Sequence, residues 1–289
     1  MRPCAKKCSW PPLPVTPGRE VRYDPDAMKA LWANDIHLEF LEPRQYDEFL
    51  RRLAEAECDC LLLGGDIGTA PNILGYLSDI QRTVRKPVYF VLGNHDYYRG
   101  SISAIRAAMQ ELHASPRWLG GMEFEPLTHK TCLVGHDGWG DGRYGNYAQS
   151  RVSLNDFELI RELKGLSRDA QLAKMMALGD EAAEHIGRVL PKALAAAEHV
   201  VVLTHVSPFV ESCIHEGRPS DADWLPFFSC KAVGDVLLDA MRQRPDRQMT
   251  VLCGHTHGQG TCQILPNLEV HTGGAKYRAP TIQRIFEWQ

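Results

Sequence analysis

Short apolar runs recur along the chain, and segments with helical spacing lie between several of them. The runs are rich in Val, Leu and Ile and predict β-strands at residues 29–33, 60–63, 87–92, 131–135, 200–204 and 249–253. Apolar side chains three and four residues apart predict amphipathic helices, with stripes at Phe49, Leu50 and Leu53; Ile102, Ile105, Met109 and Leu112; and Val233, Val236, Leu237 and Ala240. This alternation of strands and helices favours a layered α/β fold.

Two stretches depart from the alternation. Residues 1–27 are rich in proline and basic near their start, without the apolar stretch of a secretory signal, so we expect a flexible or polyproline-like extension. Because Met28 opens the first predicted strand, a translation start at Met28 is a hypothesis that mass spectrometry of the native protein can test. We expect residues 28–289 to form a single domain with an insertion at about residues 139–198, first a Gly/Tyr-rich loop and then helical sequence. The insertion could be a lid or could fill out the fold.

Composition and charge exclude several classes of protein. The 289 residues are 44% hydrophobic and 24% charged, as in ordinary globular proteins. A net charge of −4 provides no global positive field for nucleic acid or an anionic membrane, and no apolar run approaches the roughly 18–20 residues that span a bilayer. The nine cysteines are odd in number, scattered and often within apolar runs, which indicates buried thiols and a cytoplasmic location rather than a disulfide framework.

Five short polar segments follow directly after predicted strands. They are Asp35-Ile36-His37, Gly65-Asp66, Gly93-Asn94-His95-Asp96, Thr204-His205 and Gly254-His255-Thr256-His257. Loops at the carboxyl ends of strands in a layered α/β sheet meet at one edge, so the five segments can converge. Alone, a Gly-Asp is usually a turn and a Thr-His usually a polar strand end. Five in order, each made of metal-ligand residue types, indicate a functional site.

These segments resemble the motifs of the calcineurin-like metallophosphoesterase family: Asp-x-His, Gly-Asp, Gly-Asn-His-Asp, a single His, then Gly-His-x-His. The resemblance runs from about Met28 to the C-terminal strand. It implies a four-layer αββα sandwich, in which two mixed β-sheets are flanked by helices and a di-metal site lies at the strand ends. One departure is Asn34, where the family usually has Ser or Thr before the first Asp.

The family's residue roles are carried over by position in these motifs. The resemblance implies that Asp35, His37 and His257 hold one metal, that Asn94, His205 and His255 hold the other, and that Asp66 bridges both. It also implies that His95 is the catalytic histidine and that Asp96 orients its imidazole.

The chemistry of the residues agrees with these roles. Two divalent ions with Asp35 and Asp66 would leave the site electropositive, which suits a phosphate ester and a bridging hydroxide as nucleophile. His95 could then protonate the leaving oxygen, a role worth about 10²–10⁴-fold in rate. A ligand set of nitrogen and oxygen without thiolate favours Mn²⁺, Fe, Zn²⁺, Co²⁺ or Ni²⁺.

The function we expect is hydrolysis of a phosphomonoester or phosphodiester, with a small molecule or a nucleotide preferred as substrate. Alternatives on the same fold are a protein phosphatase and a nuclease, and a further alternative is a non-catalytic protein-binding scaffold with a decayed metal centre. The intact ligand positions and His95 argue against the scaffold. Neither a membrane nor nucleic acid is indicated as a partner, and the sequence specifies no oligomeric state. Weaker candidates for substrate contacts are His136, Asp137, Arg143, Tyr144, Tyr147, His215 and Arg218.

Overall fold

The first sheet carries three of the five motifs. The computed structural model describes residues 27–112, 114–215 and 217–289. In this sheet four parallel strands are joined at one edge by the antiparallel strand β13. Its order is β13 (Arg284–Trp288), β1 (Met28–Ala33), β2 (Cys60–Gly64), β3 (Val88–Val91) and β4 (Arg117–Trp118).

The second sheet carries the other two motifs and is also mixed. Strands β6, β7, β10 and β12 are parallel, and an antiparallel strand closes each edge. Its order is β11 (Gly260–Leu265), β12 (Leu268–Thr272), β10 (Gln248–Cys253), β7 (His199–Thr204), β6 (Thr131–His136) and β5 (Glu125–Pro126). A separate ribbon pairs β8 (Ile214–His215) with β9 (Arg218–Pro219).

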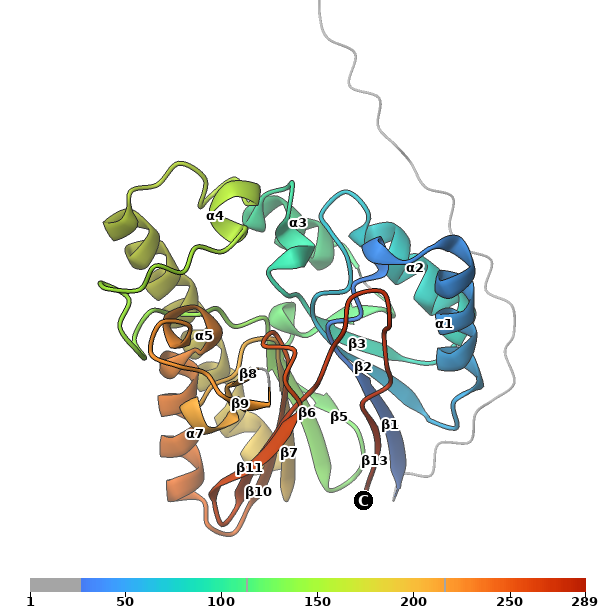
Figure 1. Cartoon of the computed structure of the whole chain (residues 1–289). Helices are drawn as coiled ribbons and strands as arrows, with labels where there is room; N and C mark the ends of the chain where they lie inside the picture. The colour runs from blue at the N-terminus through green and yellow to red at the C-terminus, as the bar shows by residue number, and fades with distance from the viewer. Residues whose placement is uncertain (1–26, 113, 216) are drawn as a thin grey trace, which may run out of the picture.

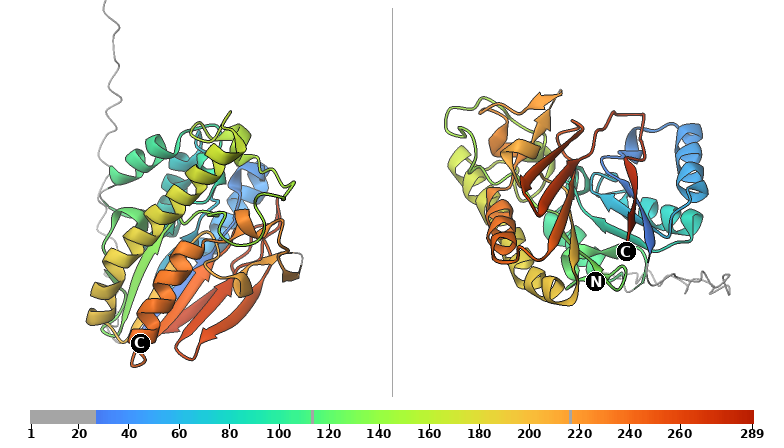
Figure 2. Two further views of the ribbon diagram at one scale, coloured as in Figure 1. Left: turned by 90° about the vertical axis from the view of Figure 1, so that its left-hand side faces the viewer. Right: turned by 90° about the horizontal axis from the view of Figure 1, so that it is seen from below.

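Helices cover the outer faces of both sheets (Figure 1). Those beside the first sheet are α1 (Pro43–Glu55), α2 (Ile73–Val84) and α3 (Ile102–Gln110), and those beside the second are α5 (Arg168–Ala196) and α7 (Lys231–Gln243). Seen from below, the two helical layers lie on opposite sides of the sheets (Figure 2, right). The shorter helices are α4 (Asp156–Leu159), α6 (Leu225–Phe228), η1 (Leu38–Phe40), η2 (His95–Tyr97), η3 (Leu119–Gly121) and η4 (Val210–Ser212).

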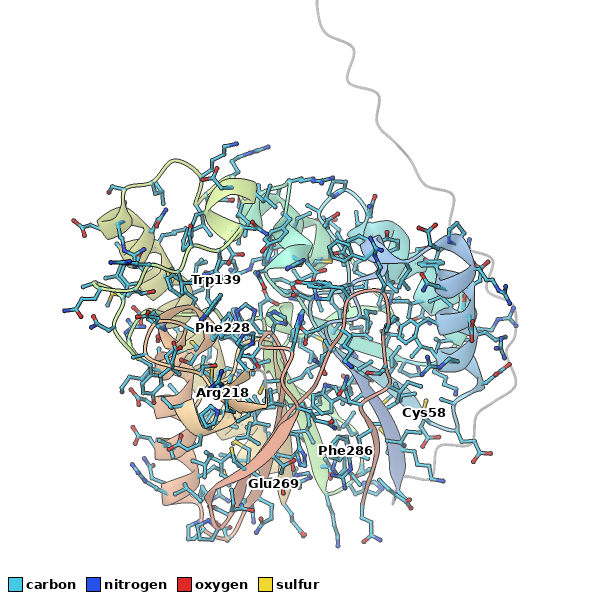
Figure 3. The ribbon with its side chains drawn as sticks, in the orientation of Figure 1. Cys58, Trp139, Arg218, Phe228, Glu269 and Phe286 are labelled. Carbon is cyan, nitrogen blue, oxygen red and sulfur yellow. The ribbon has the colours of Figure 1, made fainter. Side chains whose placement is uncertain are left out.

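Alternation of side chains along each strand produces the four layers. In β1, Ala30 and Trp32 belong to the apolar cluster between the sheets, whereas Leu31 and Ala33 belong to the cluster under the helices. Phe286 of β13, labelled in Figure 3, also belongs to the cluster between the sheets. A strand in the interior of a sheet, such as β1, therefore buries both of its faces. The expected αββα sandwich of two mixed sheets flanked by helices is confirmed.

The stretch at residues 139–198 contains much of one helical layer. Helix α5 is 29 residues long and its N-terminus is capped by the Ser167 hydroxyl, which accepts the N–H of Ala170. Its apolar stripe, including Ala182 and Ile186, packs in one cluster with Val134 of β6. None of the helices in the described residues is long and apolar enough to cross a membrane. The extension expected over residues 1–27 lies outside the described residues, apart from Ala27.

Candidate metal centre

All five motif segments begin where a strand of the two central layers ends. Asp35, Asp66 and Asn94 follow β1, β2 and β3 of the first sheet, and His205 and His255 follow β7 and β10 of the second. Because these strands run parallel within each sheet, the sandwich brings their carboxyl ends together. The ligand atoms form two groups that share Asp66, in each of which they lie within 4.8 Å of one another: Asp35, His37, Asp66 and His257; and Asp66, His205 and His255. A third group of possible ligands, which shares His37 with the first, consists of His37, Glu39 and His95.

The first group gathers around the Asp66 carboxylate. His37 Nε2 lies 3.7 Å from Asp66 Oδ2 and 3.1 Å from His257 Nε2. His257 Nε2 is in turn 3.7 Å from Asp35 Oδ1. The Asp35 carboxylate is held by the backbone N–H of His255, which donates to it at 3.0 Å. Two carboxylates and two imidazole nitrogens that face one another at such distances form a donor set that suits a divalent transition metal.

The second group lies on the other side of Asp66. His205 Nε2 is 3.5 Å from Asp66 Oδ1 and 3.2 Å from Asn94 Oδ1. His205 Nδ1 donates to the Gly64 carbonyl at 2.9 Å, which leaves Nε2, facing Asn94 Oδ1, as the nitrogen that can bind a metal once it is deprotonated. His255 Nε2 donates to the Phe227 carbonyl at 3.2 Å, which leaves Nδ1 as its acceptor. Main-chain oxygens outside the site therefore fix both tautomers, as is usual for histidines that bind metals.

The backbone of the ligand loops is strained. Eight non-glycine residues of the described chain have a positive φ, and five of them belong to the motifs: Asp35 (50°), His37 (42°), Asp66 (50°), His255 (70°) and His257 (59°). A left-handed conformation is unfavourable for residues with a β-carbon and persists only where the surrounding structure enforces it. Its concentration here indicates that the loops are shaped to aim these side chains.

Two motif glycines allow the carboxylates to approach the backbone closely. A β-carbon on Gly93 would lie 2.1 Å from Asp66 Oδ1, and one on Gly254 would lie 2.1 Å from Asp35 Oδ2. Both distances are far too short for any side chain, so these positions require glycine.

The charge states of the site suit metal binding. Burial opposes ionisation of Asp66, but His205, His95 and His37 around it hold its pKa below the usual range. Burial, followed by the neighbouring His205, lowers the pKa of His255 to about 3. Asp66 is therefore ionised and His255 neutral near neutral pH, the forms in which a carboxylate and an imidazole bind metals.

His95 stands beside the two groups and faces a carboxylate that the sequence did not suggest. Its Nδ1 is 3.5 Å from Glu39 Oε1, and the same oxygen is 3.5 Å from His37 Nδ1. The imidazole stacks on Tyr98 with ring centroids 4.3 Å apart. Burial would lower the pKa of His95, but Asp66 and Glu39 raise it to about 9 in the metal-free protein. His95 is thus protonated near neutral pH.

Asp96 does not have the predicted partner. Its Oδ1 accepts the N–H groups of Ile67 and Gly68 at 2.9 and 2.8 Å, and its Oδ2 accepts that of Gly93 at 2.8 Å. Within the described chain no hydrogen bond joins the Asp96 carboxylate to the His95 ring. The expectation that Asp96 orients the His95 imidazole is therefore wrong, because the carboxylate points back to tie the Asp66 loop to the Gly93 loop.

A second unexpected residue is Asp156, in the stretch where we expected an insertion. Its Oδ1 accepts from Asn94 Nδ2 at 2.8 Å and from the Tyr98 hydroxyl at 2.7 Å. Since Asn94 donates through its nitrogen to Asp156, its amide oxygen is directed toward His205. No local signal could have revealed this contact, because Asp156 is 62 residues from Asn94 in the chain.

A cleft of about 320 Å³ opens onto the ligand groups. Its walls include the rings of Tyr98, His215, Phe228 and Tyr277, and Phe228 is labelled in Figure 3. No lysine or arginine of the described residues lines it. Among the described residues, the only weaker candidate for a substrate contact that lines the cleft is His215. Arg143 instead forms ion pairs with Asp141 and Asp180.

Comparison with known proteins identifies the class to which this fold and site correspond. The model of the calcineurin-like phosphoesterase family matches residues 28–259, and the chain belongs to this family. It is accordingly a hydrolase acting on phosphate ester bonds, of a family that depends on a dinuclear metal centre. No curated protein sequence matches the chain significantly.

Two solved structures share the fold at low sequence identity. The phosphopantetheinyl hydrolase of Mycobacterium tuberculosis superposes with a TM-score of 0.65 at 14% identity, over 86% of this chain and 90% of that one. A dimetal phosphatase from Danio rerio has a TM-score of 0.53 at 14% identity, over 86% of this chain and 88% of that one. At this identity the similarity concerns the fold alone.

Proposed function

We propose that this hydrolase cleaves a small phosphomonoester or phosphodiester at the centre built around Asp66. The observation that carries the proposal is the arrangement of the candidate ligands in two groups that share the Asp66 carboxylate. A carboxylate common to two adjacent groups is the arrangement expected of a bridging ligand, and paired metals are a recurrent device for phosphoryl transfer.

The ligand assignment follows the two groups. Asp35, His37 and His257 would hold one ion and Asn94, His205 and His255 the other, with Asp66 between them. When bound, such ions supply Lewis acidity and a water of lowered pKa. The nitrogen and oxygen donors support Mn²⁺, Fe, Zn²⁺, Co²⁺ or Ni²⁺ as the metals.

His95 has the position to act as the proton donor. It lines the substrate cleft, and the backbone N–H of His95 donates to Asp66 Oδ1 at 2.9 Å, which fixes the residue beside the centre. With Nδ1 facing Glu39, the proton on Nε2 is available to a leaving oxygen. Glu39 takes the orienting role that we had expected of Asp96.

The cleft favours a small substrate over nucleic acid. A nuclease binds several successive phosphates and needs a basic groove, whereas no lysine or arginine of the described chain lines this cleft. Its aromatic walls instead offer flat apolar surfaces for a leaving group, such as a nucleobase or another planar group. This supports a small molecule or a nucleotide as the substrate.

The test is hydrolysis of p-nitrophenyl phosphate and bis-p-nitrophenyl phosphate with and without Mn²⁺, with EDTA as a control. We expect metal-dependent turnover, and the ratio of the two rates will show whether monoesters or diesters are preferred. His95→Ala should lose about 10²–10⁴-fold in kcat while retaining the metal content of the wild type. Loss of metal from His95→Ala would make His95 a ligand and refute its role as proton donor. A fully metallated enzyme without turnover on either ester would refute the proposed reaction on small esters.

A further inference from the structure

A second cavity of the described chain is larger than the substrate cleft. It is an open cleft of about 590 Å³ between α3 and α5, lined among others by Arg106 and Ala107 of α3 and by Lys174 and His185 of α5. No residue lines both this cleft and the substrate cleft. We refer to it as the α3–α5 cleft.

Arg106 is buried in the floor of this cleft and has an unused donor. Its side chain is 11% exposed. Nε donates to Asp137 Oδ2 at 3.2 Å and to the Tyr97 hydroxyl at 3.1 Å, and Nη1 donates to Glu181 at 2.7 Å. Nη2 is buried, and no group of the described chain accepts its hydrogens. A buried donor of this kind is costly unless a ligand or solvent satisfies it.

The guanidinium cannot turn to satisfy Nη2 within the protein, because Asp137 is fully committed. Asp137 Oδ1 accepts the backbone N–H of Leu92 and the indole N–H of Trp118, both at 2.8 Å. Its Oδ2 accepts the Tyr97 hydroxyl at 2.7 Å in addition to Arg106 Nε. Four donors thus saturate this buried carboxylate, which fixes the plane of the guanidinium.

The other polar groups of the floor are also donors. His136 Nδ1 accepts the N–H of Gly138 at 3.2 Å, and burial lowers the pKa of His136 to about 3, so the neutral ring carries its proton on Nε2. Arg188 donates to His185 Nδ1 at 3.1 Å, which places the proton of His185 on Nε2. His185 Nε2 is buried beside the Gly135 carbonyl, which is a hydrogen-bond acceptor for the ring. Arg106 Nη2 is therefore the donor of the floor that lacks an acceptor among the described residues.

The rim completes a site for an anion of organic size. Lys174 and Arg188 contribute positive charge there. Three carboxylates line the same cleft: Glu181 is bound by Arg106, Glu162 accepts the backbone N–H groups of Ile102 and Ser103, and Glu184 is the third. The indole of Trp118 and the side chain of Leu178 provide apolar surface in the same cleft.

We propose that the α3–α5 cleft is a second ligand site, which binds the carboxylate or phosphate group of a small organic anion on Arg106. Both groups present oxygen acceptors for Arg106 Nη2, the donor that Asp137, Tyr97 and Glu181 leave free. This site is separate from the metal centre and does not depend on the reaction proposed there.

The test is calorimetric titration of the metal-loaded protein with malonate and, separately, with inorganic phosphate. Because either anion can also bind the metals, the cleft is blocked by Ala107→Phe, an exposed alanine that lines it. Ala104→Phe is the matched control, since Ala104 is exposed on the same helix but does not line the cleft. Arg106→Lys keeps a cation beside Asp137 and removes Nη2.

We expect a binding event of millimolar affinity or tighter that Ala107→Phe abolishes and Ala104→Phe preserves. Arg106→Lys should weaken it roughly tenfold or more, as expected for loss of a charged hydrogen bond. If malonate binds in this way and phosphate does not, the ligand is a carboxylate. If phosphate binds in this way and malonate does not, the ligand is a phosphate ester. Binding that is equal in all variants would belong to the metal centre and overturn the proposal, as would the absence of saturable binding of either anion.

Discussion

The glycine at position 93 provides the sharpest test of the centre around Asp66. A β-carbon at this position would lie 2.1 Å from Asp66 Oδ1 and 2.5 Å from Asp66 N. Contacts of a β-carbon below 3.0 Å are essentially never seen, so Gly93→Ala must separate the two loops by at least about 0.9 Å. Asp66 is 1% exposed and its Oδ1 also accepts the His95 N–H, so the carboxylate cannot retreat without cost.

The expected magnitude follows from this displacement. Moving a catalytic group by about 1 Å can lower the rate about 100-fold. Overpacking of a closely packed site costs about 1–3 kcal/mol of stability. We therefore expect Gly93→Ala to lose about two orders of magnitude in kcat, to bind metal more weakly and to unfold at a lower temperature.

The assay is Mn²⁺-dependent hydrolysis of p-nitrophenyl phosphate, with metal content by mass spectrometry and a thermal unfolding curve. Gly75→Ala is the matched control, because Gly75 is in α2 and a β-carbon there would have no neighbour within 4 Å. That change should leave activity unaltered and raise stability by about 0.5–1 kcal/mol. A Gly93→Ala enzyme with the kcat and metal content of the wild type would show that the Asp66 carboxylate is not needed where the structure places it.

Three further predictions concern residues outside the motifs. Asp156→Ala frees the Asn94 amide to rotate, so metal affinity in an equilibrium titration should fall about 10–100-fold; an unchanged affinity would contradict the orienting role of Asp156. Glu39→Gln removes a charge that raises the pKa of His95, so the basic limb of the pH–kcat profile should move to lower pH. If that limb does not move, His95 is not the acid that titrates there. Burial lowers the pKa of His199 from 6.5 to about 4, so between these values the unfolded chain binds a proton that the folded protein does not. The free energy of unfolding should therefore fall as the pH drops from 6.5 towards 4, by at most about 1.4 kcal/mol per pH unit from this residue. In urea titrations, His199→Gln should show a shallower fall than the wild type, and parallel curves would refute the assignment.

The sequence predicted the strands and the candidate ligands because both are local. Most interior strands are short apolar runs, and the structure places β2 at Cys60–Gly64 and β10 at Gln248–Cys253, within a residue of the expected ranges. The ligands stand directly after such strands, so the parallel strands gather them at one edge of each sheet, and the packing of the two sheets brings the two sets together. The edge strands β11 and β13 were missed, because half-exposed strands lack a continuous apolar run. The interior strand β12 was also missed, because Glu269 and His271 interrupt its apolar residues.

Only the tertiary structure decided which groups touch. Glu39 faces His95, Asp156 binds the Asn94 amide, and Asp96 joins two loops through their backbone N–H groups. All three are carboxylates, and nothing in the sequence around them distinguishes these roles. Neighbours in the chain do not determine such contacts, since the turn geometry and the packing of distant elements orient each side chain. The same applies to the α3–α5 cleft, whose floor joins Arg106 to Asp137 across 31 residues. A residue's type sets the chemistry that it can perform, and the packing of the sheets and helices sets the partner with which it performs it.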